Sequence, residues 1–208
     1  MLNEEHNYYS SIIRAIVGVD EAGRGPLAGP VCAAAVVFPK DYTNDLINDS
    51  KKLTEKKREE LYDEIISNAL GYGIAFSSAD EIDELNIYEA TKKAMLEAIS
   101  QIQVPSQLIL TDAMPFPKHT PEVIPLIKGD ARCLNIAAAS ILAKVTRDRH
   151  MKELQNQYPS FSFGVHKGYG TKAHMEELEK YGPIEGVHRK SFAPVRKFFQ
   201  KQLSLLDD

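Results

Sequence analysis

The sequence predicts a layered fold of the α/β or α+β class, in which early strands are followed by helices and strands in alternation. Two features predict it: short apolar runs bounded by turn residues, and longer segments whose apolar residues recur at helical spacing. With 208 residues, 43% hydrophobic and 26% charged, the chain can bury a substantial core. We expect a single domain, residues 1–208, with a core over about residues 15–160 and a helical C-terminal portion over about 161–208.

The apolar runs predict five strands. Residues 15–20 and 31–38 form the first two, and the Gly- and Pro-rich segment 23–30 between them indicates a tight connection. Three further strands are expected at residues 71–78, 108–111 and 123–127. Two of the five runs lead directly into an acidic residue, Asp20 in the first and Asp112 in the fourth.

The periodic segments predict five helices, at residues 53–70, 87–102, 134–158, 172–181 and 193–200. The first is rich in charged residues, as a surface helix would be. The third is rich in Ala, and its apolar positions fall on one face: Leu134, Ala138, Ile141, Leu142 and Val145. The sequence shows no internal repeat and no linker long enough to separate two independent domains.

Cysteine usage and hydropathy exclude several classes of protein. Cys32 and Cys133 are isolated in apolar segments, which suggests neither a disulfide framework nor a cysteine-based zinc cluster. No apolar stretch approaches the roughly 18 residues that a membrane span requires. The N-terminal residues lack the basic end and apolar run of a secretory signal, so we expect a cytoplasmic protein.

The net charge of −4 is unevenly distributed along the chain. Residues 140–208 contain 12 Lys/Arg and 8 Asp/Glu, a local charge of +4, whereas residues 1–139 contain 13 and 21, a local charge of −8. A basic C-terminal third can meet phosphate while acids elsewhere build a metal centre. The acidic average therefore does not exclude a nucleic-acid partner.

Acids gather where strands end or turns begin: Asp20, Glu21, Asp112 and Asp130. If the strands that end at Asp20 and Asp112 are neighbours, their carboxylates meet at one edge of the sheet, where like charges repel unless a cation neutralises them. Oxygen ligands favour Mg²⁺ or Mn²⁺, and two such ions would suit a phosphodiester displacement. Glu21 can share the site only if the strand ends or bends there. The alternative is that these acids cap turns and helices.

Several segments are candidates for phosphate or sugar contacts. Gly23-Arg24-Gly25 follows the acid pair and allows a close backbone approach, although alone it also fits a simple turn. Tyr169 lies between two glycines beside basic residues, as in a stacking platform, or else it packs in a Gly-rich turn. The basic and hydroxyl candidates, which a solvated surface would also explain, are Ser50, Lys51, Lys52, Lys144, Arg147 and Arg149.

The histidines do not suggest a metal site. His119, His150, His174 and His188 have no HExxH or other ligand spacing, and we interpret them as surface or supporting groups. No GxSxG motif or Cys/His pairing favours nucleophilic catalysis by Ser or Cys.

The segment Val19 to Pro30, VDEAGRGPLAGP, closely resembles the opening signature of the ribonuclease HII family. Further motifs occur in the order of the family: DSKKL at 49–53, KGD at 128–130, AAASILAKVTRDR at 137–149 and GYGT at 168–171. Together they cover the chain from about residue 15 to 195. The resemblance implies a bacterial enzyme with the ribonuclease H fold, a central mixed five-stranded sheet flanked by helices.

The resemblance also implies roles for individual residues. It maps the catalytic, metal-binding carboxylates, with two Mg²⁺ or Mn²⁺ ions, onto Asp20, Glu21, Asp112 and Asp130. In the family, the Gly-Arg-Gly element reads the ribose 2′-hydroxyl at an RNA-to-DNA junction, and a tyrosine that matches Tyr169 stacks on the neighbouring deoxyribose. The expected reaction is endonucleolytic hydrolysis of the RNA strand of RNA–DNA hybrids and incision 5′ to ribonucleotides embedded in duplex DNA, which leaves 3′-hydroxyl and 5′-phosphate ends.

One departure from the family pattern is visible, because Ala113 follows the third acid where the family often has Gly. The related type-3 enzymes lack the intact Gly-Arg-Gly element, so its presence favours type 2. The alternatives are another nuclease of the same superfold, which would share the acids but not the 2′-hydroxyl reader, and a hybrid-binding module without turnover. Residues 202–206, QLSLL, are similar to peptides that dock on the bacterial sliding clamp, or else end an apolar helix. A monomer is expected.

Overall fold

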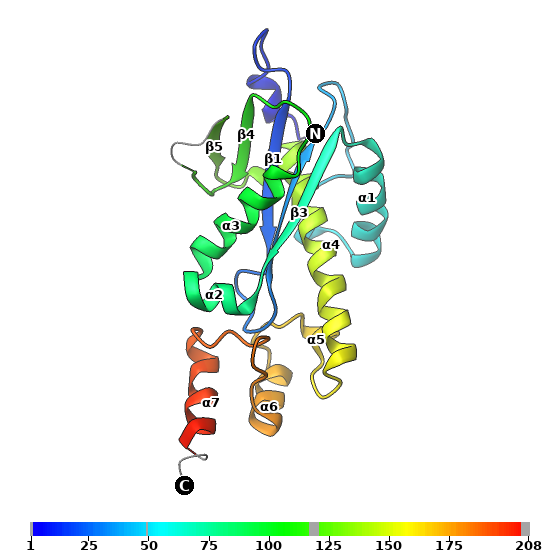
Figure 1. Cartoon of the computed structure of the whole chain (residues 1–208). Coiled ribbons are helices and arrows are strands. Elements are labelled where there is room, and N and C mark those ends of the chain that lie inside the picture. The colour runs from blue at the N-terminus through cyan, green and yellow to red at the C-terminus, as the bar shows by residue number, and fades with distance from the viewer. Residues whose placement is uncertain (1, 49, 117–120, 205–208) are drawn as a thin grey trace. The chain divides into compact units, whose positions relative to one another are not determined.

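The computed structural model describes residues 2–48, 50–116 and 121–204. Its strands form one five-stranded sheet in the order β3-β2-β1-β4-β5 (Figure 1). The strands are β1 (Ile16–Ala22), β2 (Val31–Val37), β3 (Gly71–Ser77), β4 (Leu108–Asp112) and β5 (Glu122–Leu126). The sheet is mixed, because β1 pairs antiparallel with β2 and parallel with β4, and β4 pairs parallel with β5. The expected mixed sheet of the ribonuclease H fold is confirmed.

The helices of the described chain are α1 (Glu55–Asn68), α2 (Ala79–Leu85), α3 (Ile87–Ser100), α4 (Leu134–Gln157), α5 (Phe163–His166), α6 (Lys172–Tyr181) and α7 (Ala193–Ser204). Short 3-10 turns are η1 (Glu4–Asn7), η2 (Ser50–Lys52) and η3 (Gly129–Ala131). Among the described residues, no helix is both long and apolar enough to cross a membrane.

The chain forms two compact units that interleave in sequence. The first unit comprises Met1–Ala22, Cys32–Ala75 and Lys92–Val145, and the second comprises Gly23–Val31, Phe76–Thr91 and Thr146–Asp208. Each unit has its own apolar clusters of buried side chains. They are described separately below.

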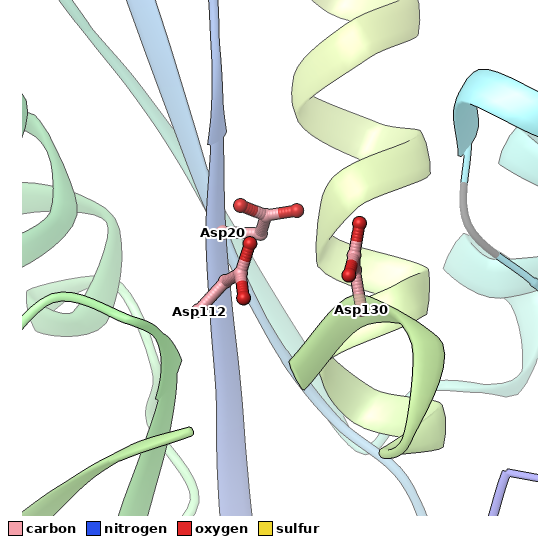
Figure 2. A group of neighbouring side chains, drawn as sticks. All are labelled: Asp20, Asp112 and Asp130. Atoms are coloured by element: carbon pink, nitrogen blue, oxygen red, sulfur yellow. The ribbon is translucent and has the colours of Figure 1, made fainter. Parts of the chain in front are cut away.

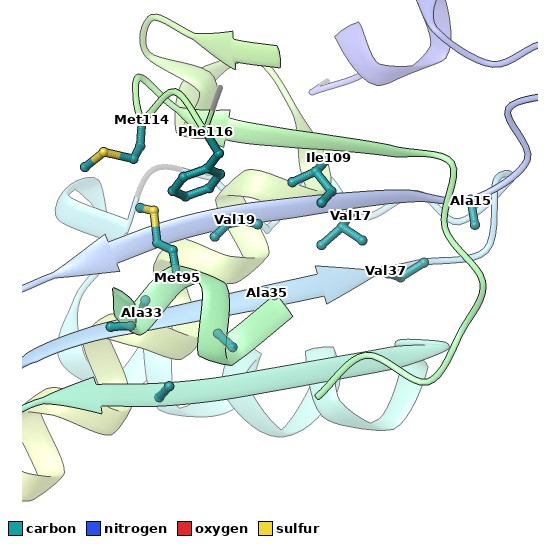
Figure 3. Close-up of a cluster of buried hydrophobic side chains, with 13 residues drawn as sticks. Ala15, Val17, Val19, Ala33, Ala35, Val37, Met95, Ile109, Met114 and Phe116 are labelled. Atoms are coloured by element: carbon teal, nitrogen blue, oxygen red, sulfur yellow. The ribbon is translucent and has the colours of Figure 1, made fainter. Parts of the chain in front are cut away.

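In the first unit, different helices cover the two faces of the sheet. Successive side chains of a strand point to opposite faces. Val17 and Val19 of β1 therefore share the cluster that contains Met95 of α3 (Figure 3). Ile16, of the opposite parity, packs instead in the cluster that contains Ile136 of α4.

The same alternation places Gly18 and Asp20 with Ile16 on the face that α4 covers. Gly18 lets the helix come close, since a Cβ there would lie 2.2 Å from the main-chain carbon of Asn135. Because α4 lies this close to β1, the Asn135 side chain reaches the strand, and its Nδ2 donates to the Ile16 carbonyl at 2.7 Å. The sequence at β1 thus seats the N-terminal part of α4 directly against the strand that carries Asp20.

In the second unit, an aromatic cluster around Phe161 and Phe163 packs against Met151 of α4, Leu178 of α6 and Phe198 of α7. A smaller cluster joins Val31, Ile82 and Ala90. These contacts bury the apolar faces of short helices that could not stand alone.

Each predicted strand and helix is confirmed within a few residues, with three corrections, one of which is that the short helix α5 at Phe163–His166 was not predicted. The helix predicted at residues 193–200 continues to Ser204. The sequence analysis also missed α2, although Ser78 and Glu81 form a capping box there: each side chain accepts a hydrogen bond from the other residue's main-chain N–H. The S-x-x-E spacing is readable in the sequence, so the signal for α2 was present and unused.

Candidate active site

Three aspartates converge in the first unit. Each of Asp20, Asp112 and Asp130 offers a carboxylate oxygen, and these atoms lie within 4.8 Å of one another. Figure 2 shows the three side chains turned toward a common point. Asp20 and Asp130 are buried and Asp112 is partly buried, so the oxygens meet with little water to screen them.

Strand pairing brings the first two aspartates together. Parallel pairing sets Val19 of β1 beside Thr111 of β4, so Asp20 and Asp112 follow at neighbouring strand ends. Asp112 also shares the parity of Leu110, which packs in the cluster on the α4 face. The expectation that these two carboxylates meet at one edge of the sheet is therefore confirmed.

Asp130 comes from a loop, and a hydrogen bond ties that loop to β4. The Gly129 N–H donates to Asp112 Oδ1 at 2.8 Å, which sets the next residue, Asp130, beside the strand end. Lys128 adopts a left-handed conformation with φ of 57°, which turns the chain from β5 into η3. No strand periodicity points to this position, so only the tertiary contact places the third carboxylate.

Glu21 differs from the other three acids. Strand β1 does not end at Asp20, because Glu21 and Ala22 stay paired with Ala33 and Cys32 of β2. The strand thus continues through Glu21, and Glu21 is not among the three residues whose oxygens lie within 4.8 Å of one another. Its charge still acts at the site, since it contributes to raising the pKa of Asp20.

The electrostatics of Asp20 show an excess of negative charge. Burial, followed by the charges of Glu21 and Asp112, raises the pKa of Asp20 well above its usual range. Two hydrogen bonds oppose the shift, one from the Ser140 hydroxyl and one from the Glu21 N–H at 2.7 Å. Ser140 also shares a hydrogen bond of 2.9 Å with Ser50. Ser140, which the sequence analysis missed, links Asp20 to the buried Ser50.

The donor set suits a hard divalent cation. Mg²⁺ at about 2.1 Å from each of two oxygens holds them no more than about 4.2 Å apart, so small side-chain rotations close the 4.8 Å group around an ion. A cation would also neutralise the repulsion that raises the pKa of Asp20. The site therefore fits a divalent metal.

Basic residues lie around the carboxylates. Lys51 Nζ is 3.6 Å from Asp130 Oδ2, with the Lys51 side chain 77% exposed. Lys52 is exposed in the same 3-10 turn. Lys144 stands one turn after Ser140 on α4, on the same helix face. These positions suit phosphate contacts for the three lysines, whereas Ser50 is only 3% exposed and its hydroxyl supports Ser140.

The Gly-Arg-Gly segment lies in the second unit, where a buried arginine holds it. Arg189 is fully buried and donates to the carbonyls of Gly23, Arg24 and Gly29, at 2.7, 2.9 and 2.9 to 3.0 Å. The segment is therefore preorganised as a turn by its own carbonyls. Arg189 was not singled out from the sequence, where an arginine near the C-terminus looks like any other surface charge.

Tyr169 lies beside this segment. A Cβ added to Gly25 would be 3.8 Å from Tyr169 Cε1, and the Tyr169 side chain is 43% exposed. The Gly168 carbonyl, next to it, accepts from the Leu27 N–H at 2.7 Å. Tyr169 thus forms an exposed aromatic surface next to the Gly-Arg-Gly turn, rather than packing inside a turn.

Burial corrects one interpretation of a basic residue and narrows that of two histidines. Arg147 is 1% exposed and donates to the carbonyls of Ala28, Pro30 and Lys167, so it is no surface contact for phosphate. Of the two alternatives for His174 and His188, burial at 0% and 1% exposed excludes a surface position and leaves a supporting role. His119 lies outside the described residues.

The loop after Asp112 keeps a glycine-like conformation. Ala113, where the family often has Gly, adopts φ of 55°, a left-handed conformation that costs a residue with a side chain about 1 kcal/mol. Its N–H donates to the Leu126 carbonyl at 3.1 Å, and the Thr111 hydroxyl donates to the Met114 carbonyl. These hydrogen bonds fix the shape of the loop after Asp112, which the sequence, with Ala113 in place of Gly, did not determine.

Comparison with known proteins agrees with this geometry. A family model, that of ribonuclease HII, matches residues 17–195. The ribonuclease HII of Bacillus cereus (strain Q1) is 54% identical over 186 residues, which are 89% of this chain and 72% of the relative. The ribonuclease H2 structure from Pyrococcus horikoshii OT3 has a TM-score of 0.77 at 30% identity, over 90% of this chain and 98% of that one. A ribonuclease HII from Archaeoglobus fulgidus, solved with PCNA, has a TM-score of 0.67 at 26% identity, over 84% and 92%.

The fold and the carboxylate cluster define a nuclease of the ribonuclease H type. The chain belongs to the ribonuclease HII family, in its bacterial form. It is therefore a hydrolase, an endoribonuclease that acts on RNA–DNA hybrids.

Proposed function

We propose that this enzyme cuts duplex DNA on the 5′ side of an embedded ribonucleotide and leaves 3′-hydroxyl and 5′-phosphate ends. The observation that carries the proposal is the Gly23-Arg24-Gly25 turn, held by Arg189 through its carbonyls beside the exposed Tyr169 ring. A preformed turn can meet a single 2′-hydroxyl without first being ordered, and the 2′-hydroxyl distinguishes RNA from DNA. An aromatic ring beside it can stack on the adjoining sugar.

Catalysis is assigned to the carboxylates of Asp20, Asp112 and Asp130, with Glu21 as a further charge near Asp20. Bound Mg²⁺ or Mn²⁺, two ions in this proposal, would supply an activated water and charge stabilisation at the leaving oxygen. The chain's own residues hold the donor oxygens in place: the Ser140 hydroxyl orients Asp20, and the Gly129 N–H orients Asp112.

The substrate contacts follow from charge and exposure. Lys51 is exposed next to Asp130 and Lys52 is exposed in the same 3-10 turn, where they can bind the phosphates that flank the cleaved bond. Lys144 adds a third cation on the face of α4 that carries Ser140. Only Ala22 separates Glu21, in the first unit, from Gly23, in the second unit.

The test compares three labelled duplexes: DNA with one ribonucleotide, all-DNA, and a continuous RNA–DNA hybrid. We expect cleavage 5′ to the single ribonucleotide with Mg²⁺ or Mn²⁺, cleavage of the hybrid, and none of either with EDTA. The variant Tyr169→Phe keeps the ring and should retain most activity on the single ribonucleotide, whereas Tyr169→Ala should raise KM about tenfold because a stacked ring contributes about 1–3 kcal/mol.

Other outcomes would overturn the proposal. Equal cleavage of the all-DNA duplex would indicate a less selective nuclease of the same fold. Tight binding of the hybrid without cleavage at any metal concentration would indicate a hybrid-binding module. Cleavage of the hybrid alone would leave the family assignment intact and exclude the reading of single ribonucleotides.

We also infer that the C-terminal tail binds a sliding clamp. Support comes from the sequence QLSLL at residues 202–206 and from the Archaeoglobus fulgidus relative, which was solved with PCNA. Helix α7 leads into this tail and ends at Ser204, while Leu205 and Leu206 lie outside the described residues. Deletion of residues 202–208 should abolish binding to a bacterial clamp in surface plasmon resonance and leave cleavage of short duplexes unchanged; unchanged clamp binding would refute the inference.

A further inference from the structure

Three buried histidines lie behind the Tyr169 loop in the second unit. His166 and His174 stack with ring centroids 4.2 Å apart, and His174 Nε2 is 3.1 Å from His188 Nε2. All three side chains are buried, and the rings of Phe161 and Phe163 contact them. The roles assigned so far to the carboxylates, the Gly-Arg-Gly turn and the Tyr169 ring use none of these imidazoles.

Each of the six ring nitrogens has a hydrogen-bond partner. His166 pairs with the Gly168 N–H and Glu177 Oε2, His174 with the Tyr169 carbonyl and His188, and His188 with the Ile184 N–H and His174. No nitrogen is left to bind a metal ion without breaking one of these bonds. The histidine array, as we call His166, His174 and His188, is therefore a closed hydrogen-bond network.

The backbone partners determine where the protons are. The Ile184 N–H can only donate, so His188 Nδ1 must be an acceptor and the neutral ring carries its proton on Nε2. His188 Nε2–H then donates to His174 Nε2, which places the His174 proton on Nδ1. The Tyr169 carbonyl can only accept, and it independently requires a proton on His174 Nδ1. Two constraints from opposite ends of the pair thus agree.

The same logic applies to His166. Its Nδ1 accepts from the Gly168 N–H at 3.1 Å, so its Nε2 carries a proton and donates to Glu177 Oε2 at 2.9 Å. Although burial alone would raise it, the pKa of Glu177 is lowered by hydrogen bonds from Ser162 and His166, in keeping with an ionised acceptor. Apart from the other histidines, Glu177 of α6 is the charged group that shifts the pKa values of His174 and His188.

The array holds the main chain on both sides of the Tyr169 ring. His174 Nδ1 donates to the Tyr169 carbonyl at 2.9 Å, and the Tyr169 N–H donates to the His166 carbonyl at 2.9 Å. Gly168, at φ of 81°, is bonded through its N–H to the His166 ring. The Tyr169 ring is exposed, while the Tyr169 carbonyl and the Gly168 N–H are hydrogen-bonded to buried imidazoles. The array therefore fixes the position of the Tyr169 ring.

We propose that His174 and His188 form a positioning pair that fixes Tyr169 for stacking on the nucleic acid, and that substrate binding weakens when the pair is protonated. The inference rests on the proposed function, because it assigns Tyr169 a contact with the substrate. An added proton on either ring replaces an acceptor with a second donor, which breaks the bond between the two rings or the bond from Ile184.

The direction of the pH effect follows from the pKa shifts. Burial lowers the pKa of His174, and burial and the neighbouring His174 lower the pKa of His188 to about 3. An opened array would regain pKa values near the ordinary value of about 6.5, so it binds more protons than the closed array between that pH and about 3. The closed array therefore loses stability relative to the open form as the pH falls below about 6.5, and KM should rise once the open form is populated, below about pH 5.5.

The first test needs no substrate. In long-range ¹H–¹⁵N correlation spectra of the full chain labelled in histidine, His174 should show the Nδ1–H form and His166 and His188 the Nε2–H form. At pH 5.5 an ordinary histidine is about nine-tenths protonated, whereas the signals of His174 and His188 should remain those of neutral rings. The opposite tautomer at His174, or normal titration of both rings, would overturn the proposal whatever the enzyme cuts.

The second test uses a matched pair of variants. His174→Asn keeps a donor near the position of Nδ1, whereas His174→Gln carries its amide nearer to Nε2 and loses the bond to the Tyr169 carbonyl. We expect His174→Gln to raise KM for the single-ribonucleotide duplex about fivefold to tenfold with kcat nearly unchanged, and His174→Asn to restore most of the loss. His150→Gln, at a half-buried histidine outside the array, is the control and should leave KM unchanged.

A double-variant cycle separates positioning from general damage. If His174 acts through Tyr169, His174→Gln should have almost no further effect on KM in a Tyr169→Ala background. Equal losses in both backgrounds, or a fall in kcat alone, would reject the positioning role. A wild-type enzyme that cuts hybrids but ignores the single ribonucleotide would reject the proposed function, while the tautomers would still test the array itself.

Discussion

Replacing Asp20 by Asn is expected to lower the cleavage rate about 10³-fold or more while the protein stays folded. Asn keeps the shape of the side chain but removes one charged oxygen donor from the three that converge. Because the pKa of Asp20 is raised by burial and by Glu21 and Asp112, the neutral amide also relieves repulsion. Thermal unfolding in EDTA should show a variant at least as stable as the wild type, and single-turnover cleavage in Mg²⁺ gives the rate.

The matched control is Asp45→Asn, at an exposed loop position away from the carboxylate group. It removes the same charge from the chain and should change neither the rate nor the stability by more than a small factor. Loss of activity in Asp20→Asn together with a lower melting temperature would point to misfolding instead. Nearly normal cleavage by Asp20→Asn would refute the assignment of the catalytic centre.

Replacing Gly23 by Ala is expected to destabilise the second unit by roughly 3 kcal/mol and to raise KM for the single-ribonucleotide duplex strongly. Gly23 has φ of 96°, and an added Cβ would lie 2.0 Å from Nε of the buried Arg147. That Nε donates to the Pro30 carbonyl at 2.9 Å, so relief of the overlap breaks a buried hydrogen bond. Urea unfolding and steady-state cleavage measure the two effects.

Substitutions at two other glycines separate backbone strain from steric overlap as the reason why Gly23→Ala is less stable. Gly182→Ala, at φ of 74° and ψ of 169° with nothing within 4 Å of the added Cβ, isolates backbone strain and should cost about 1–3 kcal/mol without any steric overlap. Gly25→Ala has ordinary φ and its Cβ would meet Tyr169 Cε1 at 3.8 Å, so stability should be nearly unchanged. If all three variants unfold alike, the overlap with Arg147 does not control the Gly-Arg-Gly turn.

Much of the fold was readable from local pattern. Apolar runs of strand length and helical periodicity predicted the elements, because side-chain alternation and helical spacing are local properties of the chain. The runs that end at Asp20 and Asp112 also predicted their meeting, since both strands bury apolar side chains and end in an acid. Helix α2 was missed because its seven residues are short and largely charged, and only its capping box marks it.

The site was less readable, because its supporting contacts cross long stretches of sequence. Ser140 reaches Asp20 from α4, and Arg189 reaches the carbonyl of Gly23, 166 positions earlier in the chain. Neither residue type announces such a role, since a buried arginine and an exposed one look alike in a sequence. For the same reason, the sequence left open whether His174 and His188 lie at the surface or support other groups, and the structure buries both.

The sequence alone determined the five strands and the longer helices, the family resemblance and the identity of the acids, because these depend on residue types and their local spacing. Tertiary structure decided how the acids are arranged: Asp20, Asp112 and Asp130 converge, whereas Glu21 lies on the continuing strand β1 and acts on Asp20 through its charge. It also decided which arginines are buried and hold main-chain carbonyls, and which nitrogen of each buried imidazole carries the proton. Those outcomes depend on burial and on partners distant in the chain, which no local pattern encodes.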